Sequence, residues 1–223
     1  MSDLRIALDA AGAAEEAAVW LAAQLRNAVR RRGAATLALS GGSTPAAMVA
    51  TLVSLAVPWA SVQVWQVDER VAPDGDAARN AGLLQALPVL PRQLHLMPVT
   101  AAHLDAAAAR YAASLPPRFD VVHLGLGDDG HAASWPPGDP VIDSPHDVAI
   151  SGEYRGRVRM TLTPPVVNRA RHRLLLVCGA AKAVPLQRWL LHDPLLPADR
   201  LRRAGTVVVA DAAAAAALPP PAE

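Results

Sequence analysis

The chain has 223 residues, of which 52% are hydrophobic and 18% charged, and its formal net charge at pH 7 is +1. This balance is typical of a folded globular protein, excludes a disordered chain, and provides no strong field for nucleic acid or an anionic membrane. A lone cysteine, Cys178, excludes internal disulfides and favours a reducing compartment. The first residues do not resemble a signal peptide, and no apolar run approaches the ~20 residues of a bilayer span. We therefore expect a cytoplasmic protein.

Apolar spacing in the first half of the chain predicts helices that alternate with short strands. The predicted elements are a helix over 11–32, a strand over 36–39, a helix over 46–55, a strand over 61–67, a helix over 80–87, a strand over 94–99 and a helix over 101–115.

The second half continues this alternation, interrupted by a proline- and glycine-rich loop. Its predicted elements are strands over 119–124, 147–150 and 157–163, a strand over 173–177, a helix over 180–191 and a strand over 206–209. The pattern predicts an α/β fold with a mainly parallel, Rossmann-like sheet flanked by helices. We expect a single domain over residues 1–223, with a small β-rich extension at 147–163 and a frayed tail at 218–223.

The strand over 119–124 runs directly into the sequence Gly-Leu-Gly-Asp-Asp-Gly-His. Ligands of parallel sheets bind at the carboxyl ends of the strands, so this loop is a candidate site. It contains a Gly-x-Gly-x-x-Gly pattern, but a dinucleotide site needs a helix there, and Pro136-Pro137 leaves room for only a short turn. His131, two residues after Asp129, is instead a candidate general base.

The segment Ser-Gly-Gly-Ser-Thr-Pro at 40–45 follows another strand. Gly41 and Gly42 allow close approach of a ligand to the backbone, and Ser43 or Thr44 can cap the next helix with Pro45 at its first position. A helix start of this kind can bind phosphate. A capped turn without a ligand is an equally good interpretation of the spacing.

Three further polar groups are candidates from their positions. The triplet at 68–70 ends a strand, and it could serve acid–base chemistry, hold an anion or form a surface ion pair. Arg159 lies on one face of a strand and could bind a phosphate or face solvent. Lys182 follows Gly179 at a helix start, where a cation is easiest to explain by a nearby anion. No histidine pair has metal-ligand spacing, so we expect no metal site.

Together these segments resemble the 6-phosphogluconolactonase family, which is related to the glucosamine-6-phosphate deaminases. The matching segments are SGGSTP at 40–45, VDER at 67–70, LGLGDDGHAAS at 124–134, RMTLT at 159–163, NRARH at 168–172 and CGAAKA at 178–183.

The resemblance implies a fold similar to glucosamine-6-phosphate deaminase and hydrolysis of 6-phospho-D-glucono-1,5-lactone in the oxidative pentose phosphate pathway. It implies no cofactor or metal, a small phosphosugar lactone as the partner, and a monomer or homodimer that binds neither nucleic acid nor membrane. His131 would activate water, and Asp129 would orient or tune the His131 ring or hold a sugar hydroxyl. The resemblance places Gly41, Gly42, Ser43, Thr44 and Asp68 at the substrate, with Arg70, Arg159 and Lys182 supplying positive charge to phosphate and oxyanion.

Three positions depart from the family pattern. Ala132 stands where threonine is usual, Trp135 begins a segment that usually reads Leu-Phe-Pro-Gly, and Arg79 replaces the serine of a Ser-Asn pair. Two alternatives remain. An aminosugar-phosphate deaminase/isomerase would carry Asn-Glu-Pro after the histidine block, where this chain has no glutamate. A sugar-phosphate-binding protein without turnover is the other.

Overall fold

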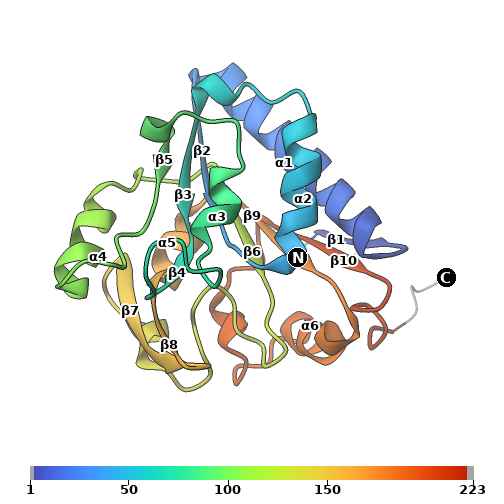
Figure 1. Ribbon diagram of the computed structural model, residues 1–223. Helices are drawn as coiled ribbons and strands as arrows, with labels where there is room; N and C mark the ends of the chain where they lie inside the picture. Colours follow the sequence, from blue (N-terminus) through green and yellow to red (C-terminus); the bar gives the residue numbers. More distant parts are fainter. Residues whose placement is uncertain (1–2, 220–223) are drawn as a thin grey trace.

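The computed structural model describes residues 3–219, and a seven-stranded parallel sheet lies at its centre (Figure 1). The strand order is β1-β10-β9-β6-β2-β3-β5, and every pairing is parallel. The strands are β1 (Asp3–Ala7), β2 (Ala35–Leu39), β3 (Val62–Gln66), β5 (Leu94–His95), β6 (Val121–Gly125), β9 (His172–Val177) and β10 (Thr206–Asp211). The predicted α/β class with a mainly parallel sheet is confirmed.

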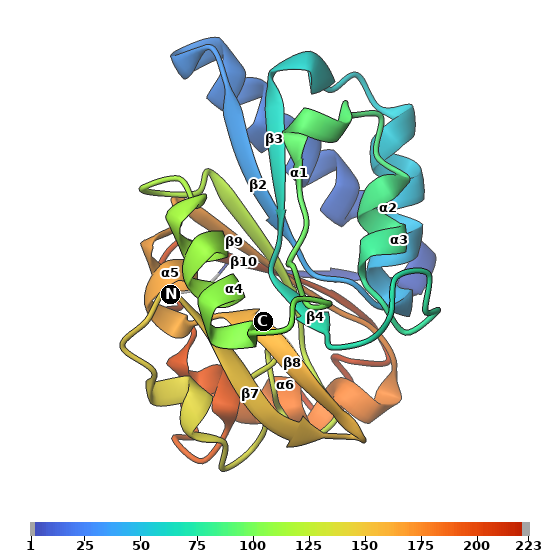
Figure 2. The same ribbon diagram turned by 60° about the vertical axis from the view of Figure 1, so that its left-hand side comes forward.

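Helices cover both faces of this sheet, as the two views show (Figures 1 and 2). One face packs against α1 (Ala10–Arg32), α2 (Ser43–Ser54) and α3 (Ala81–Gln85). The other packs against α4 (Leu104–Ala113), α5 (Pro164–Arg169) and α6 (Ala183–Leu190). The central strands are apolar on both sides because each side chain, whichever face it points to, meets a helix layer. Short 3₁₀ turns complete the chain: Trp59–Ser61, Pro91–Gln93, Pro140–Asp143, Ala180–Lys182 and Pro197–Arg200.

A second, antiparallel sheet extends from one end of the large one. Its order is β4-β8-β7, formed by β4 (Asp68–Arg70), β8 (Arg157–Leu162) and β7 (Val148–Tyr154). The hairpin between β7 and β8 turns at Arg155-Gly156, both with positive φ (50° and 76°), which suits the right-handed twist of the two strands. The predicted β-rich extension is therefore confirmed, and the Asp-Glu-Arg triplet is itself a strand of it.

Several predicted boundaries are wrong, each for a local reason. β1 was not predicted, because its five residues form a strand only by pairing with β10. α5 was not predicted, because its two prolines look like breakers but occupy the first helical positions, where proline is tolerated. The strand predicted at 94–99 has two residues, the helix predicted at 101–115 begins at Leu104, and the one at 180–191 begins as a 3₁₀ turn. Residues 220–223 of the predicted tail lie outside the described residues.

None of the helices within residues 3–219 combines the length and the apolar composition that a membrane crossing requires.

The large sheet changes direction where β2 and β6 are neighbours. From β2 the chain continues to β3 and β5 on one side, whereas β6 lies on the other side of β2 and leads to β9 and β10. The carboxyl ends of β2 and β6 therefore diverge into loops on either side of a crevice. Such a switch point is where open α/β sheets bind their ligands.

His123, in the middle of β6, is expected to make the free energy of unfolding depend on pH. Its ring is fully buried, neither nitrogen has a hydrogen-bond partner among the described residues, and burial lowers its pKa from 6.5 to about 3. Between these two values the unfolded chain binds a proton that the folded chain excludes, so the free energy of unfolding falls as pH falls. One such group removes ~1.4 kcal/mol per pH unit.

We expect the His123→Leu variant to lose ~2 kcal/mol less of its unfolding free energy than wild type between pH 7 and pH 5. Urea unfolding followed by circular dichroism at both pH values measures this difference. His146→Gln, a change at an exposed histidine, serves as the control and should behave as wild type. If wild type and His123→Leu lost the same unfolding free energy between pH 7 and pH 5, the buried ring would not be the cause of the loss.

Candidate active site

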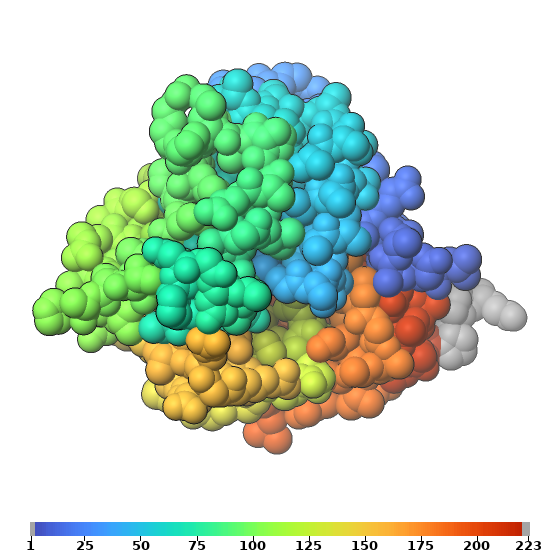
Figure 3. All heavy atoms as spheres, in the orientation of Figure 1, coloured from blue at the N-terminus to red at the C-terminus, as the bar shows by residue number. Residues whose placement is uncertain are grey.

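A cavity of about 350 Å³ opens at the carboxyl edge of the sheet, beyond the ends of β2, β6 and β9. Figure 3 shows the hollow between the cyan-to-teal upper part of the molecule and the yellow-to-orange lower part. Nine of the ten site residues predicted from sequence line it: Gly41, Gly42, Ser43, Thr44, Asp68, Arg70, His131, Arg159 and Lys182. The tenth, Asp129, is held against the His131 ring.

Asp129 fixes the orientation of His131. The Nδ1 atom of His131 lies 2.6 Å from Oδ1 of Asp129, and the His131 backbone N–H donates to the same oxygen at 3.2 Å. Nε2 is therefore the nitrogen left for the cavity. The approach requires Gly127, because a Cβ there would lie 2.1 Å from Nδ1 of His131 and 2.6 Å from the Asp129 carboxylate. This arrangement is that of a positioned base with its orienting carboxylate.

Tyr154, the last residue of β7, holds Asp129 from the other side. Its hydroxyl donates to Oδ2 of Asp129 at 2.5 Å, and its ring meets the His131 ring edge-on at a centroid distance of 5.4 Å. Burial opposes ionisation of Asp129, but the hydrogen bonds from Tyr154 and His131 outweigh it and lower its pKa to about 2. Burial and the adjacent carboxylate raise the pKa of Tyr154 to about 12. At neutral pH the pair is a carboxylate and a neutral phenol.

The Asp-Glu-Arg strand divides its side chains between the interior and the cavity. Glu69 is fully buried and accepts hydrogen bonds from the backbone N–H groups of Asn80 and Ala81, at 2.7 and 2.9 Å. Its carboxylate also forms an ion pair with Arg79 at 3.0 Å. Because side chains alternate along a strand, Asp68 and Arg70 point the opposite way and line the cavity. Glu69 is thus a structural residue that anchors the loop after β4.

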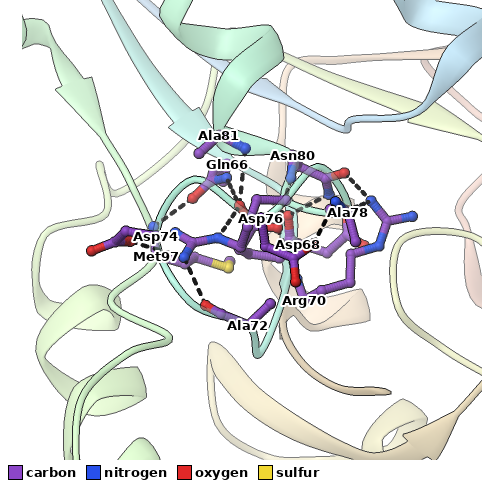
Figure 4. Close-up of polar contacts among 12 residues, drawn as sticks. Gln66, Asp68, Arg70, Ala72, Asp74, Asp76, Ala78, Asn80, Ala81 and Met97 are labelled. Atoms are coloured by element: carbon purple, nitrogen blue, oxygen red, sulfur yellow. Dashed lines mark hydrogen bonds and ion pairs between the residues drawn. The ribbon is translucent and has the colours of Figure 1, made fainter. Parts of the chain in front are cut away.

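Asn80 is hydrogen-bonded to this strand at Asp68 and Arg70 (Figure 4). Arg70 donates to the side-chain oxygen of Asn80 and, at 3.1 Å, to the carbonyl of Ala78, while the Asn80 amide donates to the carbonyl of Asp68 at 2.9 Å. A Cβ at Gly41 would lie 2.1 Å from the Asn80 oxygen, so only glycine fits there. The Arg70 guanidinium is therefore fixed at the cavity wall.

Arg159 faces Arg70 across the pairing of β4 and β8. It is 7% exposed, its Nε has no hydrogen-bond partner among the described residues, and its guanidinium lies 5.1 Å from the Tyr154 ring centroid. Burial, and then the charge of Arg70, lower the pKa of Arg159. Lys182 and Arg155 also line the cavity, which brings the cations on its wall to four. A buried guanidinium beside a like charge is costly unless an anion neutralises it.

The acidic groups at the cavity already have partners. Asp68 accepts a hydrogen bond from the Ser134 hydroxyl at 2.6 Å, and Asp128 forms an ion pair with Arg155 at 2.5 Å. The four cations on the cavity wall outnumber these two carboxylates, so the cavity keeps a surplus of positive charge, which suits a phosphate.

The start of α2 differs from the prediction. Gly42, with a φ of 115°, is the N-cap, Ser43 is the first helical residue, and no side chain caps the helix. The predicted caps by Ser43 or Thr44 are wrong, and Pro45 is the third helical residue rather than the first. The positive φ of Gly42 turns the chain so that the uncapped start of α2, from Gly42 to Pro45, lines the cavity.

No group of three or more His, Cys, Asp or Glu side chains within residues 3–219 is placed to hold a metal ion. Cys178 also lines the cavity, but burial and the charge of Asp211 raise its pKa to about 11, so it is a protonated thiol and a poor nucleophile.

Two groups at the site could not be predicted from local sequence. Tyr154 lies at the end of a strand with no motif around it, and Asn80 lies in a polar loop. Their contacts with Asp129 and Arg70 arise only when the β7–β8 hairpin and the loop after β4 fold over the sheet edge. The Asn80 position carries a weak signal, since it follows the Asp-Glu-Arg triplet as the second residue of the Arg-Asn pair.

Comparison with known proteins agrees with this geometry. Residues 8–209 match the family described as glucosamine-6-phosphate isomerases/6-phosphogluconolactonase. A 6-phosphogluconolactonase of Synechocystis sp. is 36% identical over 184 residues, which cover 75% of this chain and 76% of the relative. One from Caulobacter vibrioides is 34% identical over 221 residues, covering 86% of this chain and 90% of that protein.

Solved structures of similar proteins share the fold of this chain. The 6-phosphogluconolactonase of Leishmania guyanensis superposes with a TM-score of 0.88 at 25% identity, covering 98% of this chain and 99% of that one. A monomeric glucosamine-6-phosphate deaminase superposes with a TM-score of 0.85 at 18% identity, covering 96% and 99%, a likeness of fold alone. With matches of this length and identity, the chain belongs to the glucosamine-6-phosphate isomerase/6-phosphogluconolactonase family.

Proposed function

We propose that the protein hydrolyses 6-phospho-D-glucono-1,5-lactone to 6-phospho-D-gluconate in the oxidative pentose phosphate pathway. The observation that carries this proposal is the Asp129–His131 pair, 2.6 Å apart, beside a cavity lined by four cations, Arg70, Arg155, Arg159 and Lys182. The proposal is supported by relatives at 34–36% identity that bear the name 6-phosphogluconolactonase.

His131 acts as the base. With Nδ1 held by Asp129, Nε2 takes a proton from a water molecule as its oxygen attacks the lactone carbonyl carbon. The carbonyl oxygen becomes an oxyanion in a tetrahedral intermediate, and the Asp129 carboxylate stabilises the charged imidazole. When the intermediate collapses, the ester bond to the ring oxygen breaks and Nε2 returns the proton to that oxygen. The products are the open-chain acid and an unchanged histidine.

The cations on the cavity wall differ in whether other protein groups already bind them. Arg70 is fixed by Asn80 and Ala78, so it can stabilise an oxyanion without moving as charge develops. Arg159 and Lys182 form no ion pair with the described residues. We assign these two side chains, together with the uncapped start of α2, to the phosphate.

The activity is tested by following acid release from the lactone. The lactone also hydrolyses spontaneously, so the enzymatic rate is the part of the total rate that increases in proportion to protein concentration. We expect saturable hydrolysis and no ammonia from glucosamine 6-phosphate. Ammonia release would instead identify an aminosugar-phosphate deaminase. Tight binding of 6-phosphogluconate without turnover of the lactone would identify a sugar-phosphate-binding protein.

Tyr154 is expected to act as a positioning residue. Removal of its hydroxyl in Tyr154→Phe leaves one Asp129 oxygen without its donor, so the carboxylate holds His131 less firmly. We expect kcat to fall about tenfold, the loss of one hydrogen bond to a charged group, while KM changes little. Steady-state kinetics of the lactone reaction measure both. Tyr111→Phe, at a buried tyrosine away from the cavity, is the matched control, and a rise in KM alone would contradict a positioning role.

A further inference from the structure

A second cationic cavity lies at the opposite, amino edge of the sheet. Its volume is about 240 Å³, and we call it the arginine pocket. Its charged and titratable lining residues are Arg31, Arg32, Arg118, Asp120, Arg171 and His172.

Three neighbouring strands place these residues. Arg31 and Arg32 end α1 just before β2, Arg118 and Asp120 precede β6, and Arg171 precedes β9. These are the same three strands whose carboxyl ends open into the candidate active site. Because all strands of the sheet are parallel, their amino ends meet at one edge, and the fold itself gathers the arginines there.

Both oxygens of the one carboxylate in the arginine pocket, that of Asp120, already have partners within the protein. Oδ1 of Asp120 lies 2.5 Å from Arg32 and 3.2 Å from Arg171, while Oδ2 accepts hydrogen bonds from the backbone and hydroxyl of Thr36 at 3.0 and 3.3 Å. Four guanidinium groups around one carboxylate leave a surplus of three positive charges when His172 is neutral. Among residues 3–219, Arg31 and Arg118 have neither an ion-pair nor a hydrogen-bond partner, so both can bind an anion.

Further arginines lie close to the pocket, and pocket arginines contribute to the lowered pKa values of two neighbouring groups. The pKa of His172 is lowered by burial and then by the nearby charge of Arg173, with Arg118 and Arg171 adding to the effect. Burial, together with the charges of Arg202 and Arg118, lowers the pKa of Arg173 to about 10. The folded protein therefore holds like charges together at this edge, and a bound anion would relieve their repulsion.

We propose that the arginine pocket binds a small anion with two linked phosphate groups. A phosphate group carries about 1.5 to 2 negative charges, so one phosphate leaves part of the surplus and two linked phosphates neutralise it. Guanidinium groups match phosphate oxygens in pairs, and Arg31 and Arg118 are free to do so. The volume lies below the ~300–1,000 Å³ of ordinary ligand sites, so the pocket has room for a diphosphate group, and any group attached to the diphosphate would lie outside it.

Isothermal titration calorimetry of the full chain with inorganic pyrophosphate tests the proposal. We expect the Arg31→Gln/Arg118→Gln double variant to bind at least tenfold more weakly than wild type. Arg92→Gln/Arg110→Gln removes the same two charges at exposed arginines outside the pocket, and it should bind as wild type. Thermal unfolding of each variant shows whether it is folded. Equal loss of affinity in both double variants would mean that net charge, and not this pocket, binds the anion.

The candidate active site also carries cations, so the binding site must be located. Arg159→Met weakens the proposed phosphate site of the active-site cavity alone, so it should leave the binding that depends on Arg31 and Arg118 unchanged. The proposal would be overturned if Arg159→Met lost pyrophosphate binding while Arg31→Gln/Arg118→Gln kept the wild-type affinity. Inorganic phosphate should bind at least tenfold more weakly, and equal affinity would refute the requirement for two phosphates. Binding of ADP as well as pyrophosphate would identify a nucleotide as a source of the diphosphate, and binding of pyrophosphate alone an inorganic one. Because no activity is measured, failure here leaves the lactonase proposal unaffected.

Discussion

Replacement of His131 by alanine is expected to lower kcat for the lactone at least ~10²-fold, the usual contribution of a general base. The variant keeps the cations and the uncapped helix start, so substrate should still bind and KM should stay within a few-fold of wild type. Acid release must be recorded at several protein concentrations, since the enzymatic part of the rate is then separated from spontaneous hydrolysis.

A matched control comes from another histidine. His146→Gln changes an exposed ring outside the cavity, and it should keep full activity. The assignment of the base would be wrong if His131→Ala retained the wild-type kcat while Lys182→Ala alone abolished it. That outcome would move the proton transfer to the lysine side of the cavity.

The segment after His131 favours hydrolysis over deamination. Ser134 donates to Asp68, and Trp135 is fully buried with its ring N–H donating to the carbonyl of Leu162 at 2.8 Å. This stretch therefore packs the hairpin of the small sheet against the loop, and it contributes no glutamate to the cavity. Ala132, which departs from the family pattern, is fully buried in the core and does not line the cavity, so its missing hydroxyl removes nothing from the wall.

The parts of the site that could be predicted from the sequence are those that lie at the carboxyl ends of strands. The glycine loop after β2 and the histidine loop after β6 come together because parallel strands deliver their carboxyl ends to one edge, and that rule can be applied to a sequence. The separate roles of Asp68 and Glu69 could not be predicted. Two adjacent carboxylates look alike in a sequence, and only the pairing of β4 with β8 shows that Glu69 points inward.

The strand β1 and the contact of Tyr154 with Asp129 could not be predicted for the same reason, since both depend on parts of the chain that are distant in sequence. β1 is a short strand whose charged Arg5 pairs with Asp3 and Glu16, and it becomes a strand through its neighbour β10 rather than through its own pattern. Tyr154 reaches Asp129 from 25 residues away, across a hairpin whose position depends on the whole small sheet. Contacts of this kind are products of tertiary packing, which local periodicity does not encode.

Arg159→Met is expected to separate binding from stability. Loss of a charge-assisted hydrogen bond to phosphate, worth ~1.5–3 kcal/mol, should raise KM ~10–100-fold, while kcat falls much less because His131 and Asp129 are untouched. The free energy of unfolding should not fall, since the variant removes a 7%-exposed cation that lies opposite Arg70 without a carboxylate partner, and methionine fills similar space.

Arg157→Met, two residues away on β8, is the matched control for the same side-chain change. Arg157 is 38% exposed and pairs with Asp76 at 3.1 Å, so its loss should cost at most ~1 kcal/mol of stability and leave KM nearly unchanged. Lactone kinetics and urea unfolding of the two variants give the comparison. A loss of more than ~1 kcal/mol of unfolding free energy in Arg159→Met, with KM unchanged, would make Arg159 a structural residue. A rise in KM in Arg159→Met without loss of stability would support the proposed role of Arg159 in phosphate binding, since a buried guanidinium beside a like charge gains from a bound anion.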